Sequence, residues 1–356
     1  MWPNNRILDL FGIQVPIIQA PMAGSVSSDM VVAVSEAGGL GSLPCALLSP
    51  DQTRVELDAI RRQTACPINV NFFCHKLPRV EANRETLWRQ RLRPYYLELG
   101  LDHNQAVPSV NRAPFDDKMC DLVVKFHPEV VSFHFGLPDE KLLARVRASG
   151  AKIISSATSV DEARWLEHRG CDAIIAQGYE AGGHRGIFLT NDVSTQAGTM
   201  ALVPQVVDAV NVPVIAAGGI ADARGIVAAF ALGAAAVQIG TAYLLCPEAK
   251  ISPVYRQALK NAKDNQTVLT NVFTGRPARG IVNRLVKELG PMSDDVPEFP
   301  LAGAALAPLR SNSEAAGSVA FTPLWSGQAA HLARELSAAD LTKRFATETL
   351  EKLRAL

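Results

Sequence analysis

Short apolar runs recur eight times along the first 240 positions of the chain, mostly separated by segments with helical periodicity. Most of these runs are apolar at consecutive positions, which is typical of parallel strands covered on both faces. The predicted strands are 16–21, 39–43, 67–73, 130–135, 152–157, 173–177, 212–217 and 235–240. The helices visible between them are 29–36, 50–62, 139–148, 160–169, 201–210 and 222–232.

Cap residues support several of these helices. Ser159 and Asp222 stand where N-caps are expected, and Gly150, Gly170 and Gly233 follow helix ends. The alternation predicts an α/β fold, a (β/α)8 TIM barrel, with active-site residues at the C-terminal strand ends. A doubly wound sheet is the alternative, but no GxGxxG turn follows an early strand.

Two long segments interrupt the repeat. Residues 75–125 follow the third strand and include a charged, helical stretch at 79–93, and residues 246–356 follow the eighth strand and end in a helix at 337–356. We therefore expect a barrel domain at 1–245 with a helical insertion around 75–125. The C-terminal helical extension, 246–356, would pack on the barrel as a lid or form a dimer face. Loops of this length in a compact domain are usually functional or structured, so both are expected at the catalytic end.

Composition and charge narrow the classes of function. The chain has 356 residues, 48% of them hydrophobic, with 35 basic and 35 acidic side chains. This balance gives no attraction to nucleic acid or to an anionic membrane. Six scattered cysteines without a CxxC pair predict no metal site and a reducing, cytoplasmic location. No secretory signal is expected at the N-terminus, and the uncharged stretch 225–247 is interpreted as a buried helix and strand, not a membrane span.

The stretch 177–188, with the sequence Gln-Gly-Tyr-Glu-Ala-Gly-Gly-His-Arg-Gly-Ile-Phe, carries the clearest chemical signal. It follows a predicted strand, and its glycines let the backbone approach a flat ligand because no Cβ intervenes. His184 is the imidazole of this loop. We interpret the loop as the mouth of a cofactor site with His184 directed into it. A glycine-rich turn that carries an incidental surface histidine is the alternative.

Two further strand ends predict a phosphate-binding turn. The seventh strand leads into Gly218 and Gly219, and the eighth ends in Gln238, Ile239, Gly240 and Thr241. In (β/α)8 barrels the loops after strands seven and eight commonly bind phosphate, with backbone N–H groups directed at its oxygens. The Thr241 hydroxyl adds a donor. The alternative is a pair of ordinary turns that need positive φ.

Polar groups at other strand ends are suited to a flat heteroaromatic ring. The backbone at Ala20, Pro21 and Met22 and the amide of Asn71 can serve the edge and face of an isoalloxazine. Gln177 would serve the ring or the ribityl chain. His134, at the end of the fourth strand, would orient an anionic substrate or tune the other imidazole; a satisfied polar plug is the alternative.

Together these segments resemble the nitronate monooxygenases, formerly called 2-nitropropane dioxygenases, which are FMN-dependent (β/α)8 enzymes. The resemblance rests on residues 19–24, 69–72, 132–136, 177–184, 217–220 and 238–241. It extends to Phe-Thr-Pro-Leu-Trp-Ser-Gly-Gln at 321–328, which is similar to the C-terminal signature of class I members. The Glu-Ala-Gly-Gly-His element at 180–184 is its narrowest part. Flavin-dependent enoyl-acyl-carrier-protein reductases and some quinone reductases share this element.

The resemblance implies oxidation of an alkyl nitronate, or of a nitroalkane, by O2 to a carbonyl compound and nitrite through an anionic flavin semiquinone. His184 would abstract the α-proton of a neutral nitroalkane, and His134 would help hold the anionic nitro group. Defence against a toxic nitronate is the implied role. FMN would be non-covalent and held by Ala20, Pro21, Met22, Asn71, Gln177, Gly182, Gly183, Gly218, Gly219, Gln238, Ile239, Gly240 and Thr241.

Two alternatives and one departure from the family stay open. An NAD(P)H-dependent FMN reductase of quinones or enoyl thioesters would share the barrel and the flavin site, and a non-catalytic flavin-binding barrel is the third reading. Class I members would place a lysine and tyrosines ahead of the C-terminal signature, where this chain has Phe299 and Arg310. We expect these two residues to stand in for them, and the substrate preference to differ accordingly. A homodimer is one expected assembly.

Overall fold

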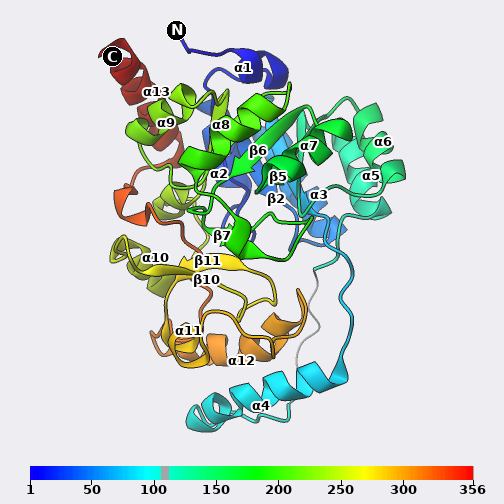
Figure 1. Cartoon of the computed structure of the whole chain (residues 1–356), viewed down its shortest axis with the longest axis vertical. Helices are drawn as coiled ribbons and strands as arrows, with labels where there is room; N and C mark the ends of the chain where they lie inside the picture. The colour runs from blue at the N-terminus through cyan, green and yellow to red at the C-terminus, as the bar shows by residue number, and fades with distance from the viewer. Residues whose placement is uncertain (106–111, 356) are drawn as a thin grey trace.

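The computed structural model describes residues 1–105 and 112–355 and confirms the predicted (β/α)8 barrel (Figure 1). Eight parallel strands pair in the order β1-β9-β8-β6-β5-β4-β3-β2. The sheet closes because Ile18 bridges to Leu40, immediately ahead of β2. The strands are β1 Ile17–Gln19, β2 Gly41–Pro44, β3 Ile68–Phe73, β4 Val130–His134, β5 Lys152–Ala157, β6 Ala173–Gln177, β8 Val214–Ala217 and β9 Ala236–Ile239.

The last helix of the chain completes the ring of helices around this barrel. This helix, α13 (Ala338–Ala355), packs between α9 (Ala223–Ala231) and α2 (Ser28–Glu36). Its buried Thr342 hydroxyl bonds the Tyr243 hydroxyl at 2.8 Å. This helix therefore packs on the barrel. The ring consists of α2 Ser28–Glu36, α3 Pro50–Gln63, α5 Asp117–Phe126, α6 Glu140–Ala148, α7 Val160–His168, α8 Thr199–Ala209, α9 Ala223–Ala231 and α13 Ala338–Ala355.

The predicted caps are present. The Ser159 hydroxyl accepts from the backbone N–H of Glu162 at 3.2 Å, and Asp222 accepts from the N–H of Arg224 at 2.9 Å. Gly150, Gly170 and Gly233 all have positive φ. The uncharged stretch 225–247 is the buried helix and strand that the sequence predicts, and in the described ranges no helix is long and apolar enough to cross a membrane.

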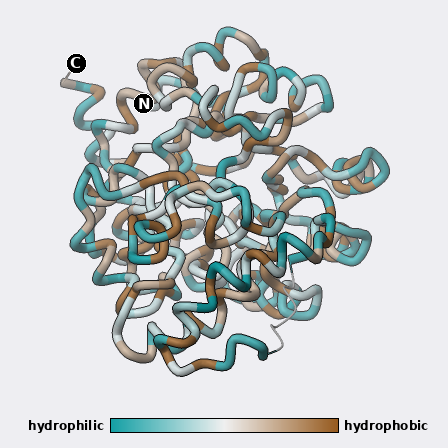
Figure 2. Tube along the Cα trace, turned by 60° about the horizontal axis from the view of Figure 1, so that its bottom comes forward, coloured by the Kyte–Doolittle hydropathy of each residue, from teal (hydrophilic) through white to brown (hydrophobic). Residues whose placement is uncertain are grey.

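Helix α4 of the insertion, Ala82–Glu98, and residues 267–315 of the extension form a second layer at the C-terminal end of the barrel (Figure 1). The insertion helix, α4, packs on α12 (Ala302–Ala315) of the extension. There the Trp88 indole donates to the Ala302 carbonyl at 3.2 Å, and the Tyr96 hydroxyl donates to the Ala305 carbonyl at 2.7 Å. Many of the hydrophilic segments lie on the outside of the molecule (Figure 2). The remaining helices are α1 Arg6–Phe11, α4 Ala82–Glu98, α10 Pro253–Lys260, α11 Arg284–Leu289 and α12 Ala302–Ala315, with short 3-10 turns η1 Val193–Thr195, η2 Thr241–Leu245 and η3 Ala330–Leu332.

A small antiparallel sheet, absent from the sequence prediction, joins this layer to the barrel. Strands β10 (Thr267–Thr270) and β11 (Ala278–Ile281) of the extension form a hairpin, and β11 pairs with β7 (Gly183–His184). The extension is therefore not only helical. Because β7 belongs to the loop after β6, the extension fixes the backbone of the loop that carries His184.

A close backbone contact strengthens this attachment. The segment 321–328 crosses the loop at Gly182, where an added Cβ would lie 2.6 Å from the Ser326 carbonyl carbon and closer still to the Gly327 nitrogen. Beside it, the N–H of Gln328 donates to the Glu180 carbonyl at 3.1 Å. Only glycine permits this approach.

Replacing Gly182 by Ala should therefore lower the free energy of unfolding by about 1–3 kcal/mol, since the crowding atoms are backbone and cannot rotate away. Urea titration measures this free energy. The matched control is Gly225→Ala in α9, where an added Cβ makes only ordinary contact, at 3.4 Å. A Gly182→Ala variant as stable as the wild type would show that the crossing is not tight.

Candidate active site

One cavity lies at the C-terminal strand ends, between the barrel and the extension. It encloses about 1350 Å³ of empty space, part of it open to solvent. Its lining includes Ala20, Pro21, Met22, Asn71, His134, Gln177, Gly182, Gly183, His184, Gly218, Gly219, Gln238, Gly240 and Thr241. Of the residues predicted to hold FMN, and of the two predicted histidines, only Ile239 lies elsewhere, because its side chain is buried in the barrel core.

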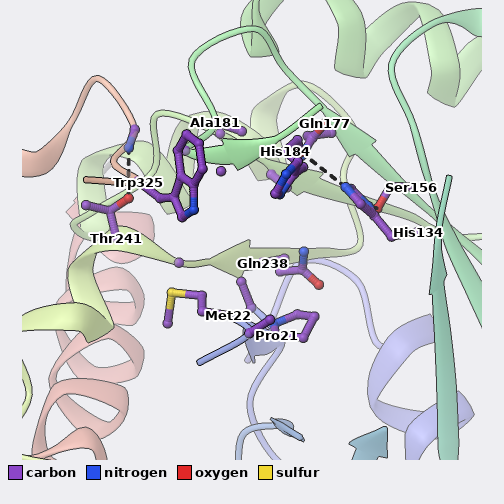
Figure 3. A pocket seen from close by; sticks show the side chains of 18 of the residues that line it. Pro21, Met22, His134, Ser156, Gln177, Ala181, His184, Gln238, Thr241 and Trp325 are labelled. Atoms are coloured by element: carbon purple, nitrogen blue, oxygen red, sulfur yellow. Dashed lines mark hydrogen bonds between the residues drawn. The ribbon is translucent and has the colours of Figure 1, made fainter. Parts of the chain in front are cut away.

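The cavity contains a flat slot between two groups of side chains (Figure 3). His184 and Trp325 lie on one side, with ring centroids 5.4 Å apart, and Pro21, Met22 and Gln238 lie on the other. The Gln238 Oε1 atom is buried and has no hydrogen-bond partner in the described structure. A buried oxygen of this kind calls for a donor from a ligand, so the slot is suited to a flat molecule with a polar edge.

The strand ends after β8 and β9 provide free donors beside the slot. Gly218 and Gly219 have φ of 113° and 69°, and no acceptor for their N–H groups, or for that of Gly240, occurs in the described part of the chain. The Thr241 Oγ1 atom accepts from the Gly327 N–H at 2.9 Å, which leaves its own proton available to a ligand. This donor set is suited to a phosphate or a similar anion.

His184 presents a neutral imidazole with one free nitrogen. The Thr274 hydroxyl donates to the Arg276 carbonyl at 3.3 Å, so we infer from the network that His184 Nε2 carries a proton and donates to Thr274 Oγ1 at 3.0 Å. Nδ1 is then the basic nitrogen. Burial, followed by the charge of Arg112, holds the pKa of His184 well below its usual value of 6.5.

His134 and Gln177 both hold the backbone of His184. Each donates from a side-chain nitrogen to the His184 carbonyl at 3.1 Å. The other His134 nitrogen contacts the Ser156 hydroxyl at 3.1 Å, and Gln177 Oε1 accepts from the Gly186 N–H at 2.7 Å. Burial lowers the pKa of His134 to about 3, so the ring is neutral. Both His134 nitrogens therefore have partners within the protein, Ser156 Oγ and the His184 carbonyl.

The two residues expected to replace the family's lysine and tyrosine have different positions. Phe299 packs against His184, with ring centroids 5.3 Å apart. Arg310 lies outside the cavity on α12 and pairs with Glu314 at 2.8 Å. The cation that lines the cavity is Arg112, with its guanidinium 5.8 Å from the centre of the Phe299 ring. The sequence alone does not reveal Arg112 as a cavity residue because it lies in the insertion, where no strand pattern points to a catalytic end.

Other cavity residues that sequence analysis missed come from separate elements: Phe73 at the end of β3, Ser156 in β5, Tyr255 in α10 and Trp325 in the extension. Trp325 stands within the segment 321–328, which was noted only as a signature. Aromatic residues at strand ends and in helical segments are usually core residues, so nothing in the sequence alone separates them from the barrel packing.

Comparison with known proteins gives a consistent family. Residues 4–348 match the family model described as nitronate monooxygenase. A nitronate monooxygenase of Pseudomonas aeruginosa is 39% identical over 347 residues, which cover 97% of this chain and 99% of that protein. A probable nitronate monooxygenase of Staphylococcus aureus is 39% identical over 336 residues, covering 94% of each chain.

Two solved structures share the fold along their whole length. The nitroalkane oxidase of Streptomyces ansochromogenes has a TM-score of 0.89 and 36% identity, with 98% of this chain and 99% of that chain covered. FabK of Thermotoga maritima has a TM-score of 0.73 and 29% identity, with 100% and 99% covered. The barrel, the histidine-bearing loop and these similarities over nearly the full length agree, and the chain belongs to the nitronate monooxygenase family.

Proposed function

We propose that this protein is an FMN-dependent nitronate monooxygenase that oxidises alkyl nitronates, and neutral nitroalkanes, with O2 to a carbonyl compound and nitrite. The observation that carries the proposal is the neutral imidazole of His184, which faces a flat slot whose far side holds the unpartnered Gln238 oxygen. Relatives named for nitronate and nitroalkane oxidation support the substrate class.

The residues present fit FMN. The N–H groups of Gly218, Gly219 and Gly240 and the Thr241 hydroxyl would hold its phosphate. Gln238 Oε1 would accept from an N–H of the ring, and Asn71 Oδ1 would do the same, since the Asn71 NH2 group is used by the Ser132 hydroxyl at 2.9 Å. When bound, FMN would supply one-electron oxidation of the nitronate and pass electrons to O2.

His184 would act as the base for neutral nitroalkanes. Its Nδ1 accepts the α-proton, and the imidazolium that forms stabilises the nitronate beside it. Its environment keeps it unprotonated at neutral pH, as a base requires. A substrate that arrives as a nitronate needs no base. His134 and Gln177 would act through His184 by fixing its main chain, in place of the substrate-holding role that sequence analysis gave His134.

A flavin reductase is the second candidate because flavin-dependent enoyl-acyl-carrier-protein reductases share the Glu-Ala-Gly-Gly-His element found here at 180–184. The two functions differ in the electron donor, since a reductase takes hydride from NADH or NADPH. Anaerobic mixing with each donor and a flavin absorbance record separates them: bleaching by NADPH together with no effect of a nitronate would assign the reductase.

Replacing His184 by Asn should lower kcat/KM for 1-nitropropane by about 10²–10⁴-fold. It should leave kcat/KM for propane-1-nitronate within tenfold, because this substrate lacks the proton that a base removes. Nitrite formation measures both rates. The matched control, His168→Asn on the exposed end of α7, should match the wild type. Equal losses on the two substrates would rule out the base role.

The pH dependence has a definite direction. Since the pKa of His184 is lowered from 6.5, kcat/KM for 1-nitropropane should stay flat through pH 6.5 and fall only at lower pH, where the imidazole is protonated. The rate for propane-1-nitronate should show no matching fall down to the pH at which the nitronate itself is protonated. A fall in kcat/KM for 1-nitropropane centred at or above pH 6.5 would contradict a lowered pKa of His184.

A further inference from the structure

Arg112 is a cation in a cavity that offers it no acid. The described residues that line the cavity include no Asp or Glu. Over residues 1–105 and 112–355 the Arg112 guanidinium takes part in no ion pair and in no side-chain hydrogen bond. Burial lowers the pKa of Arg112 from 12.5, and an Arg is charged at any working pH. A guanidinium that is partly buried, and that has no ion-pair partner among the described residues, can bind an anion.

The backbone and the side chain of Arg112 are both held. The His75 ring bonds the Arg112 carbonyl through Nε2 at 3.1 Å, and burial lowers the pKa of His75 to about 4, so this ring is neutral. His75 also packs edge-on against Phe299 at 4.8 Å between centroids, and Phe299 lies under the guanidinium. Phe299 in turn contacts His184 at 5.3 Å. Arg112 and His184 therefore meet the same aromatic ring.

The other cations near the site are engaged within the protein. The buried Arg185 donates to Gln196 Oε1 and to the Gly178 and Gln177 carbonyls, and the buried Arg279 donates to the Tyr179 carbonyl. Arg276 lies over the Phe135 ring at 3.9 Å and donates to the Ile187 carbonyl, and it is not among the residues that line the cavity. Arg112 is thus the basic side chain of the described structure that reaches the cavity wall.

We propose that the Arg112 guanidinium binds the two oxygens of the substrate's nitronate or nitro group, and the nitrite product, beside His184. A nitronate carries its charge on two oxygens in one plane, as a carboxylate does, and the fork of a guanidinium matches such a pair with two parallel hydrogen bonds. This inference rests on the proposed function for the identity of the substrate. It assigns to Arg112 the anion-binding role that the sequence suggested for His134.

Arg112 would also tune the base. After burial, its charge is the largest cause that lowers the pKa of His184, followed by His134, Arg276 and His75. Because His134 and His75 are neutral and Arg276 is turned to Phe135, loss of the Arg112 charge should raise the pKa of His184 toward 6.5. A substitution at Arg112 therefore has two separable effects, one on anion binding and one on the pH profile.

The test compares Arg112→Met with Arg310→Met, which removes the same charge from outside the cavity. Calorimetric titration of the FMN-loaded protein with sodium nitrite, at constant ionic strength, should show a dissociation constant at least tenfold higher for R112M and unchanged for R310M. KM for propane-1-nitronate should rise at least tenfold in R112M, with kcat changed less. Arg112→Lys should be intermediate, since lysine keeps the charge without the fork.

The pH profile supplies a readout that a purely structural role would not move. In R112M the acid limb of kcat/KM for 1-nitropropane should shift to higher pH, and in R310M it should stay. Nitrite affinity equal in R112M and the wild type would overturn the proposal. Absence of nitrite formation from any nitro substrate by the wild type would instead refute the proposed function, and the nitrite titration would still decide the role of Arg112.

Discussion

The main-chain carbonyl of His184 is the point on which the site depends. It accepts hydrogen bonds from His134 and Gln177, each at 3.1 Å, so two barrel strands fix the backbone of a loop residue. The same residue pairs with Ala278 of β11, and its ring bonds Thr274. The imidazole is thus held from the barrel on one side and the extension on the other, which gives a loop residue the precision of a strand residue.

This double attachment explains why the chain needs its long extension. The slot has the barrel's strand ends on one side and Trp325 of the extension on the other, and Gly182 lets the two backbones meet. Enclosure also sets the electrostatics. Burial is the leading cause of the lowered pKa of His75, His134 and His184. The enclosure that keeps water out of the site therefore also keeps these imidazoles neutral.

The barrel could be predicted from sequence because its signals are local. Consecutive apolar residues, caps such as Ser159 and glycines such as Gly233 each act within a few positions, and strand ends then meet by the symmetry of the fold. The hairpin β10–β11 escaped prediction because its strands are short and β11 contains Arg279 and Gly280. Arg112 escaped because only tertiary packing brings the insertion to the cavity. His134 lies at the end of β4 as the pattern indicated, but its hydrogen-bond partners, Ser156 in β5 and the His184 carbonyl in β7, depend on tertiary structure.

The measurement that tests the central claim most directly is product formation by the FMN-loaded protein in air with propane-1-nitronate and no nicotinamide. We predict nitrite and propanal in equal amounts, with O2 consumed and no change on adding NADPH. Absence of nitrite, together with rapid oxidation of NADPH by the same preparation, would contradict it and assign the neutral His184 site to a reductase.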